Sequence, residues 1–414
     1  DYGVSSDEYS SRIKGFVTLN YLGEIVSKEY TKKIKKDKNI PDIKNYEQKI
    51  YGVVFEAPAS FLEIIFKIKD KKNQFILRHY LNFLIFFIGL IFFYKILKLR
   101  FENWFVPLIG SIILVLSPRI FANSFYNNLD IPFMAFLTIT ACLGMRFLRK
   151  PNKKYIFLFS LFSAISIDIR LIGIILPVLI CTTFFFHGIK KKDFKNTFIT
   201  LFSVFFMTVF LVVLFWPMLW ENPFQNFISV ITNLAHHPLK LDIFFFGETI
   251  RVDNVPWYYL PTWIFISNPI LYSLLFIFGA SLIAIILIGL TKRMKSKSID
   301  MIFFLLIVIP LLIPILLGST LYNGWRHVYF IYPFMVYFMI FFIFFIIEKI
   351  DNKKINFILK LLLFFGLLDI SFWMIKNHPH QYVFFNKITR EDVSHNFEMD
   401  YIAASYKENL EYLI

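Results

Sequence analysis

The chain has 414 residues, 57% of them hydrophobic and 18% charged, with a mean hydropathy of +0.60 and a formal net charge of +15. This hydropathy excludes an ordinary soluble globular protein. The excess of Lys and Arg would suggest a nucleic-acid partner in a soluble protein, but much of it lies in short loops between apolar segments. That is the charge distribution of a membrane protein, so no nucleic acid is expected.

Residues 1–79 precede the first long apolar segment and form a predicted external loop. The loop opens with DYGVSSDEY, in which Asp7 and Glu8 are adjacent carboxylates. A carboxylate held beside a substrate hydroxyl is a candidate general base, although an acidic pair is also common at a solvated surface or a helix N-terminus. Residues 51–67 are apolar but interrupted by two glutamates and a proline. This pattern predicts a helix lying in the membrane interface.

Residues 80–376 are predicted to form a transmembrane bundle of about ten helices, because a bilayer core needs about 20 apolar residues per helix. Two short segments are separated by Asp168-Ile169-Arg170 and would form two thin helices or one broken helix; two are favoured. The predicted spans are 80–99, 103–118, 131–148, 155–168, 171–187, 197–217, 267–290, 300–318, 328–348 and 356–375.

Basic residues alternate between the connecting loops. The short loops after the first, third, fifth, seventh and ninth spans are rich in Lys and Arg, whereas the loops between them carry few. Short cytoplasmic loops are enriched in this way, so the Lys-rich loops are predicted to face the cytoplasm and the others the external side. Residues 1–79 are also basic, but the rule applies only to short loops.

The predicted external loop SPRIFANSFYNNLDIP (117–132) holds Arg119 and Asp130 between two spans. Asp130, followed by Pro132, suits a helix N-cap and suits a catalytic role equally. Arg119 could bind a substrate phosphate or extend generically toward lipid phosphates.

Two further basic pairs open predicted spans on the external side. LYNGWRHVYF places Arg326 and His327 at the start of one span, and Arg78-His79 stands at the start of the first. Because these residues run against the charge bias, they are candidates to bind a substrate phosphate or, equally, to anchor lipid headgroups.

The long external loop 218–266 is rich in Trp and Tyr, which are typical of the membrane–water boundary. Residues 377–414 are predicted to begin an external tail. The chain starts without Met and without a signal-type apolar region, so both of its ends are expected to be truncated.

No metal site is expected from the sequence. HisHisPro at 236–238 and His378-Pro-His380 have no cysteine or carboxylate partner at a spacing typical of zinc. Cys142 and Cys181 lie in apolar runs, which argues against a disulfide framework. The motifs of P-loop enzymes, dinucleotide enzymes, serine hydrolases and zinc proteases do not occur.

Several strings, in order, resemble bacterial membrane glycosyltransferases of the protein O-mannosyltransferase and aminoarabinose-transferase type. They are DYGVSSDE, SPRIFANSFYNNLDIPF, PWYYLPTW, LYNGWRHVYFIYP, HPHQYVFFN and NFEMDYIAASYKENLEYL. The resemblance implies the glycosyltransferase C fold, an all-α polytopic helix bundle with external loops and interfacial helices. It also implies a polyprenyl-phosphate-linked sugar as donor and an acidic residue in the first external loop at the reaction centre.

Carried over to this chain, the family's Asp-Glu pair falls on Asp7 and Glu8, with Asp7 as the base, and Asp130 falls on a second acidic position. Ser6 stands where the family usually has an aromatic residue. The residues that the resemblance makes candidates for the donor phosphate or substrate are Arg78, Arg119, Asp130, Arg326 and His327.

The chain is therefore predicted to be a hexosyl- or pentosyltransferase of the bacterial inner membrane. It would move a sugar to a hydroxyl of a protein, lipid or glycan on the periplasmic face, with inversion, and would need no nucleotide cofactor; a divalent metal is left open. The alternative is a multi-pass transporter or flippase for a lipid-linked or anionic solute. That activity needs charges near the membrane midplane, for which Asp168 and Arg170 are the main candidates. A ligase or polymerase of larger glycans fits the strings less well.

Overall fold

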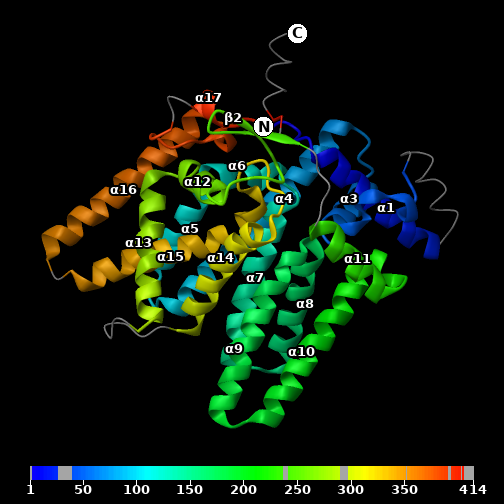
Figure 1. The fold of residues 1–414 in the computed structure, drawn as a ribbon, viewed down its shortest axis with the longest axis horizontal. Helices are drawn as coiled ribbons and strands as arrows, with labels where there is room; N and C mark the ends of the chain where they lie inside the picture. The colour runs from blue at the N-terminus through cyan, green and yellow to red at the C-terminus, as the bar shows by residue number, and fades with distance from the viewer. Residues whose placement is uncertain are drawn as a thin grey trace. The chain divides into compact units, whose positions relative to one another are not determined.

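The computed structural model describes residues 2–26, 40–235, 241–289, 297–350, 352–389, 393–401 and 403–404 (Figure 1). Helices dominate this part of the chain, which contains a single two-stranded sheet. Two compact units can be distinguished. The N-terminal unit is made mainly of residues 3–87 and 124–236, and the C-terminal unit mainly of residues 88–123 and 237–401. The prediction of an all-α polytopic membrane fold is confirmed.

Eight of the described helices are long and apolar enough to cross a membrane, or nine spans arise if one bent pair is counted as a single span. α8 (Lys153–Ile169), a helix of 17 residues, is not among them, and the count of about ten spans stays a prediction. The eight are Lys71–Arg100 (α4), Asp130–Arg149 (α7), Leu171–Lys191 (η3 and α9), Phe194–Phe215 (α10), Ile270–Leu287 (α13), Ser298–Leu317 (α14), Arg326–Lys349 (η5 and α15) and Lys353–Lys376 (α16).

The predicted span 103–118 corresponds to α5 (Phe105–Val115), which forms a bent pair with the next helix, α6 (Pro118–Tyr126). The two helices meet at 69°. Pro118 explains the break, because proline donates no backbone hydrogen bond and disfavours helical backbone in the residue before it. The prediction of a loop over 117–132 is accordingly wrong for the residues that form α6.

The predicted span 155–168 is α8 (Lys153–Ile169), a helix of 17 residues. α8 begins after Asn152, whose side chain accepts a hydrogen bond from the backbone N–H of Tyr155 at 3.0 Å. It ends at Arg170, whose backbone is extended, with φ −145° and ψ 127°. The chain then enters η3 (Leu171–Ile174) and α9 (Ile175–Lys191), so the interpretation as two separate helices is correct.

In the N-terminal unit, the consecutive helices α7, α8, α9 and α10 alternate in direction, each antiparallel to the next (Figure 1). An ion pair between Arg170 and Asp130 places the end of α8 beside the start of α7. The Lys-rich turns after α7 and after α9 lie at the opposite end of these helices, roughly 30 Å away for a 20-residue helix. Two of the Lys-rich loops thus share one end of this unit, and the ion pair marks the other.

Short elements surround the ion-pair end of the unit, and α3 among them has an inverted amphipathic pattern. Glu56 and Glu63 on α3 are buried, whereas Phe61 and Ile65 are 50% and 51% exposed. An apolar face turned outward is the arrangement expected of a helix in the membrane interface. The short elements are α1 (Glu8–Val26), η1 (Ile43–Asn45), η2 (Glu47–Ile50), α3 (Glu56–Ile65), η4 (Pro217–Trp220) and α11 (Pro223–Ala235).

In the C-terminal unit, α15 is the central helix and α16 a peripheral one. The apolar window of the α15 span is 72% buried and that of α16 only 11%, so α16 presents most of its apolar surface outward. A hairpin precedes these helices, with Phe246 and Gly247 at φ +53° and +77°, as a two-residue hairpin turn requires. The remaining elements are β1 (Asp242–Phe245), β2 (Glu248–Arg251), α12 (Tyr259–Ile266), η6 (Gln381–Val383) and α17 (Val393–Asn396).

Candidate active site

The acidic pair lies at the start of α1, and its two carboxylates have different surroundings. Asp7 is exposed, whereas Glu8 is 1% exposed. Glu8 accepts a hydrogen bond from the backbone N–H of Ser5 at 2.6 Å, and its other oxygen lies 2.8 Å from Nε2 of His79. Glu8 is thus held inside the unit, and Asp7 is the member of the pair that is open to solvent.

Buried charges join α1 to α3 and α3 to α4. Arg12 on α1 donates from Nε to Oε2 of Glu63 on α3 at 2.9 Å. Arg78 on α4 donates from Nη1 to Glu56 at 2.5 Å and from Nη2 to Ser60 at 2.7 Å. Removing one partner of a buried ion pair is strongly destabilising, so these pairs fix the helix that carries Asp7.

A lysine and a glutamate in the same interior have shifted pKa values. Burial lowers the pKa of the Lys14 ammonium, and the carboxylates of Glu56 and Asp168 oppose that shift. Burial also raises the pKa of Glu56, and Arg78 and Lys14 oppose it. Both shifts have the same cause, because an ion loses its water on entering this interior. Groups of this kind occur at functional sites and in structural ion-pair networks alike.

Asp168, at the end of α8, holds the segment that leads into α3. Its Oδ2 accepts hydrogen bonds from the backbone N–H groups of Val53 at 3.0 Å and Val54 at 2.9 Å. The neighbouring Gly52 approaches the backbone of Asp168 so closely that a Cβ there would lie 1.8 Å from its carbonyl oxygen. The start of α3 is therefore fixed to the end of α8.

Asp130 is the first residue of α7 and is 3% exposed. Its carboxylate pairs with Arg170 and accepts a hydrogen bond from Nδ2 of Asn127 at 3.0 Å. The interpretation of Asp130 as an N-cap is wrong: Asn127 Oδ1 instead accepts the hydrogen bond from the backbone N–H of Asp130, at 2.9 Å. The Asp130 carboxylate instead forms the ion pair with Arg170.

Arg119 lies in the C-terminal unit and is 2% exposed. Its Nε donates to the carbonyl oxygen of Phe384 at 3.0 Å, and its guanidinium carbon is 4.7 Å and 5.4 Å from the ring centroids of Phe385 and Trp263. Both terminal nitrogens are buried and find no hydrogen-bond partner among the described residues. Arg119 thus has donors available for an anion.

Arg326 and His327 also belong to the C-terminal unit and are half-buried. The guanidinium carbon of Arg326 lies 5.2 Å from the ring centroid of Tyr322, and the His327 ring lies 4.7 Å from the same ring. Both predicted residues therefore pack against one tyrosine.

The sequence interpretation missed the charged residues that hold the site of the N-terminal unit. It noted Glu56 and Glu63 only as interruptions of an apolar segment. Their spacing of seven residues places them on one face of a helix, and that was an available signal for a buried acidic face. The missed residues are Arg12, Lys14, Glu56 and Glu63, and Asp168 was named only as a charge that a transporter would need.

No metal site is found in the part of the chain that the structure describes: no group of three or more His, Cys, Asp or Glu side chains there could hold an ion. His378 instead contacts Nε2 of Gln381 at 3.2 Å and packs on the ring of Tyr2. The HisHisPro sequence at 236–238 lies outside the described residues.

Residues 57–216 match the family of dolichyl-phosphate-mannose-protein mannosyltransferases. This region includes Arg78, Arg119 and Asp130 and begins after Asp7 and Glu8. No curated protein matches the chain. The match covers less than half of the chain and bears out the predicted resemblance to mannosyltransferase-like membrane glycosyltransferases of the glycosyltransferase C type.

Proposed function

We propose that this membrane glycosyltransferase moves a sugar from a polyprenyl-phosphate donor to an acceptor hydroxyl, with Asp7 as the general base. The reaction takes place on the periplasmic face of a bacterial inner membrane. The matched family is named for dolichyl-phosphate mannose, a lipid-phosphate-linked sugar, which supports this class of donor.

The chemistry needs few groups. The lipid phosphate is already a leaving group, so no nucleotide is required. Asp7 takes the proton from the acceptor hydroxyl as its oxygen attacks the anomeric carbon, and the bond from that carbon to the lipid phosphate breaks. A single displacement of this kind inverts the anomeric carbon. Cations near the departing phosphate stabilise its charge.

The observation that carries the proposal is the contrast between the two carboxylates of the acidic pair. Glu8 is occupied by His79 and by the N–H of Ser5, whereas Asp7 is exposed on the same fixed helix end. A base must reach its substrate and must also be held in place, and Asp7 meets both conditions. Asp130 is buried with partners on both carboxylate oxygens, so we assign it a positioning role in which it orders the chain before α7.

The transporter alternative receives less support from the placement of charge. Asp168 and Arg170 lie at the end of α8 and not in the middle of a span. The buried pair of Arg100 and Asp300, 3.2 Å apart, also joins helix ends, those of α4 and α14. A transport pathway would instead place such groups near the membrane midplane.

The test compares wild type with Asp7→Asn in proteoliposomes that contain a labelled polyprenyl-phosphate sugar and candidate acceptors. We expect Asp7→Asn to lose about 100-fold or more of the turnover, because general-base catalysis contributes that much, while the thermal midpoint stays unchanged. Asp193→Asn, at an exposed carboxylate before α10, is the matched control. Wild-type turnover in Asp7→Asn would remove Asp7 as the base. Movement of the labelled lipid across the bilayer without sugar transfer would favour the transporter.

A further inference from the structure

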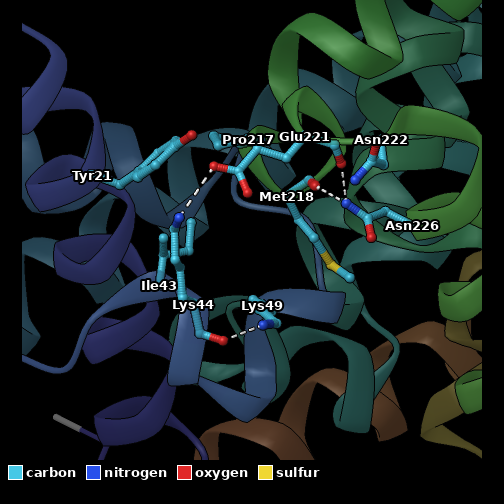
Figure 2. Close-up of a pocket in the computed structure, with 9 residues that line it drawn as sticks. All are labelled: Tyr21, Ile43, Lys44, Lys49, Pro217, Met218, Glu221, Asn222 and Asn226. Atoms are coloured by element: carbon cyan, nitrogen blue, oxygen red, sulfur yellow. Dashed lines mark hydrogen bonds and ion pairs between the residues drawn. The ribbon is translucent and has the colours of Figure 1, made fainter.

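A cavity of about 270 Å³ lies in the N-terminal unit between α1, the η1–η2 segment and the η4–α11 connection (Figure 2). Its floor is apolar, and its rim carries side chains that donate and accept hydrogen bonds. This volume is just below the range of about 300–1,000 Å³ found for drug-sized ligands, so it suits a molecule about as large as one sugar ring. The lining residues are Tyr21, Ile43, Lys44, Lys49, Pro217, Met218, Glu221, Asn222 and Asn226.

An exposed ion pair closes one side of the cavity. In Figure 2 the ammonium of Lys44 points across the opening to the carboxylate of Glu221, and the two atoms are 3.5 Å apart. The two side chains are 68% and 63% exposed, and an exposed pair of this kind contributes only about 0–1 kcal/mol. Both side chains can therefore exchange their mutual contact for contacts with a ligand at little cost.

The backbone beside the cavity is arranged independently of that ion pair. Asn226 Nδ2 donates to the carbonyl oxygens of Met218 at 2.8 Å and of Glu221, which fixes the turn between η4 and α11. Asn222 within this turn has φ +51°, in the left-handed region that asparagine adopts more readily than most other residues. The turn thus holds the carboxamide of Asn222 and the carboxylate of Glu221 at the rim.

The mixture of groups distinguishes among ligand classes. Two ammonium groups, one carboxylate, two carboxamides and one phenol supply both donors and acceptors, with the amide hydrogens of Asn226 already used within the turn. A sugar hydroxyl is both donor and acceptor and matches such a rim. A free phosphate would meet the carboxylate of Glu221 on the same rim, and like charges repel. Tyr21, which packs against Trp220 with ring centroids 6.0 Å apart, adds an aromatic surface of the kind that apolar sugar faces contact.

We infer that this cavity binds one ring of a neutral carbohydrate. Tyr21 lies on α1, which begins directly after Asp7, and is roughly 20 Å farther along the helix axis at 1.5 Å per residue, so the cavity is separate from the proposed base. It therefore holds a sugar distant from the reacting hydroxyl, as one unit of an extended acceptor. The inference deepens the proposed function and rests on it for this acceptor role.

The test is direct binding, without donor or turnover. Purified protein is placed in a detergent whose headgroup is not a sugar, since a maltoside would compete for the cavity. Binding of the methyl glycosides of mannose, glucose, galactose and N-acetylglucosamine is followed by saturation-transfer NMR, and inorganic phosphate is added as a competitor to measure anion binding. Glu221→Ala removes the carboxylate, and Asn222→Gly removes the carboxamide while glycine keeps the positive φ. Asp193→Asn is the matched control, because it alters an exposed carboxylate outside the cavity.

We expect at least one glycoside to bind, and binding to weaken about tenfold in Glu221→Ala, as expected for loss of a hydrogen bond to a charged group. Asn222→Gly should also weaken binding, and Asp193→Asn should leave it unchanged. Thermal midpoints equal to wild type show that the variants are folded. Absence of binding by all four glycosides, binding unaffected by both cavity variants, or tighter binding of phosphate would each overturn the inference. None of these results bears on Asp7, whose own test is turnover.

Discussion

Glu8 and His79 meet inside the N-terminal unit with Oε1 and Nε2 2.8 Å apart. Glu8 is the second member of the acidic pair, and His79 directly follows Arg78 in the sequence. Their contact ties the start of α1 to α4 and leaves Asp7 as the exposed carboxylate. The two adjacent acids therefore have separate tasks, one in structure and one in the proposed chemistry.

The first prediction separates these tasks by stability. Glu8→Ala removes the acceptor for the N–H of Ser5 and the partner of His79, and we expect it to lower the free energy of unfolding by about 1–3 kcal/mol. Asp7→Asn should change it by less than about 0.5 kcal/mol, because the side chain is exposed. Thermal unfolding in detergent measures both. Equal midpoints for the two variants would contradict the division of roles.

The second prediction concerns the ion pair of Asp130 and Arg170, whose side chains are 4% and 20% exposed. Arg170→Ala leaves a buried carboxylate without its cation and should lower the free energy of unfolding by about 3 kcal/mol or more. The control is Arg251→Ala, because Arg251 pairs with Asp253 at the surface, with exposures of 64% and 47%. That variant should cost between 0 and about 1 kcal/mol. A similar small loss for both variants would show that the buried pair does not hold the helix ends together.

The third prediction uses the close approach of Gly52 to Asp168. A Cβ on Gly52 would lie 1.8 Å from a backbone oxygen, so Gly52→Ala must displace the segment that enters α3 and should cost about 3 kcal/mol or more. At Gly366 the nearest atom is the flexible side-chain end of Leu271, at 2.5 Å, and Gly366→Ala should be tolerated better. Expression level and thermal midpoint are compared for the two variants. A thermal midpoint of Gly52→Ala equal to that of wild type would show that the fold does not require the close approach of Gly52 to Asp168.

The spans were predictable from sequence because hydropathy is a local property. The long apolar segments became α4, α10, α13, α14 and α16 near the expected positions. The break at Pro118 also had a local cause and could have been recognised, since a proline inside a predicted helix ends or bends it. What remained hidden is the set of contacts that hold the site.

Those contacts join residues far apart in the chain. Arg12 and Glu63 are 51 residues apart, and Asp168 accepts its hydrogen bonds from residues 115 and 114 positions earlier. Many pairings of acids and bases satisfy the sequence equally well, and only packing selects one. The acidic motif could be located by resemblance, but the separation of Asp7 from Glu8 by exposure required the fold.

The fourth prediction concerns pH. Burial lowers the folded-state pKa of Lys14 below its ordinary value of 10.5, so between these two pKa values the unfolded chain binds more protons than the folded protein. The contribution of Lys14 to the free energy of unfolding therefore rises as the pH increases from the folded-state pKa to the ordinary pKa. The groups that interact with it are Glu56, Asp168, Arg170 and Arg78.

Lys14→Met should remove this rise and flatten the dependence of the thermal midpoint on pH toward the alkaline side. The control is Lys69→Met, at an exposed lysine, which should keep the wild-type slope. An unchanged slope in Lys14→Met would show that Lys14 does not titrate in this window. A steeper slope would reverse the assigned sign.

The fifth prediction compares two buried arginines. Arg78 has carboxylate partners, so Arg78→Met leaves Glu56 buried without its nearest cation and should cost about 3–5 kcal/mol. Arg119 has no carboxylate partner among the described residues, and Arg119→Met loses one backbone hydrogen bond and its aromatic contacts, about 1–2 kcal/mol. If the free donors of Arg119 bind the donor phosphate, added polyprenyl phosphate should raise the thermal midpoint of wild type and not that of Arg119→Met. Phosphate-free polyprenol controls for the effect of the lipid chain. An equal rise in both proteins would exclude Arg119 as the phosphate ligand, because a site without its cation cannot keep the same affinity for an anion.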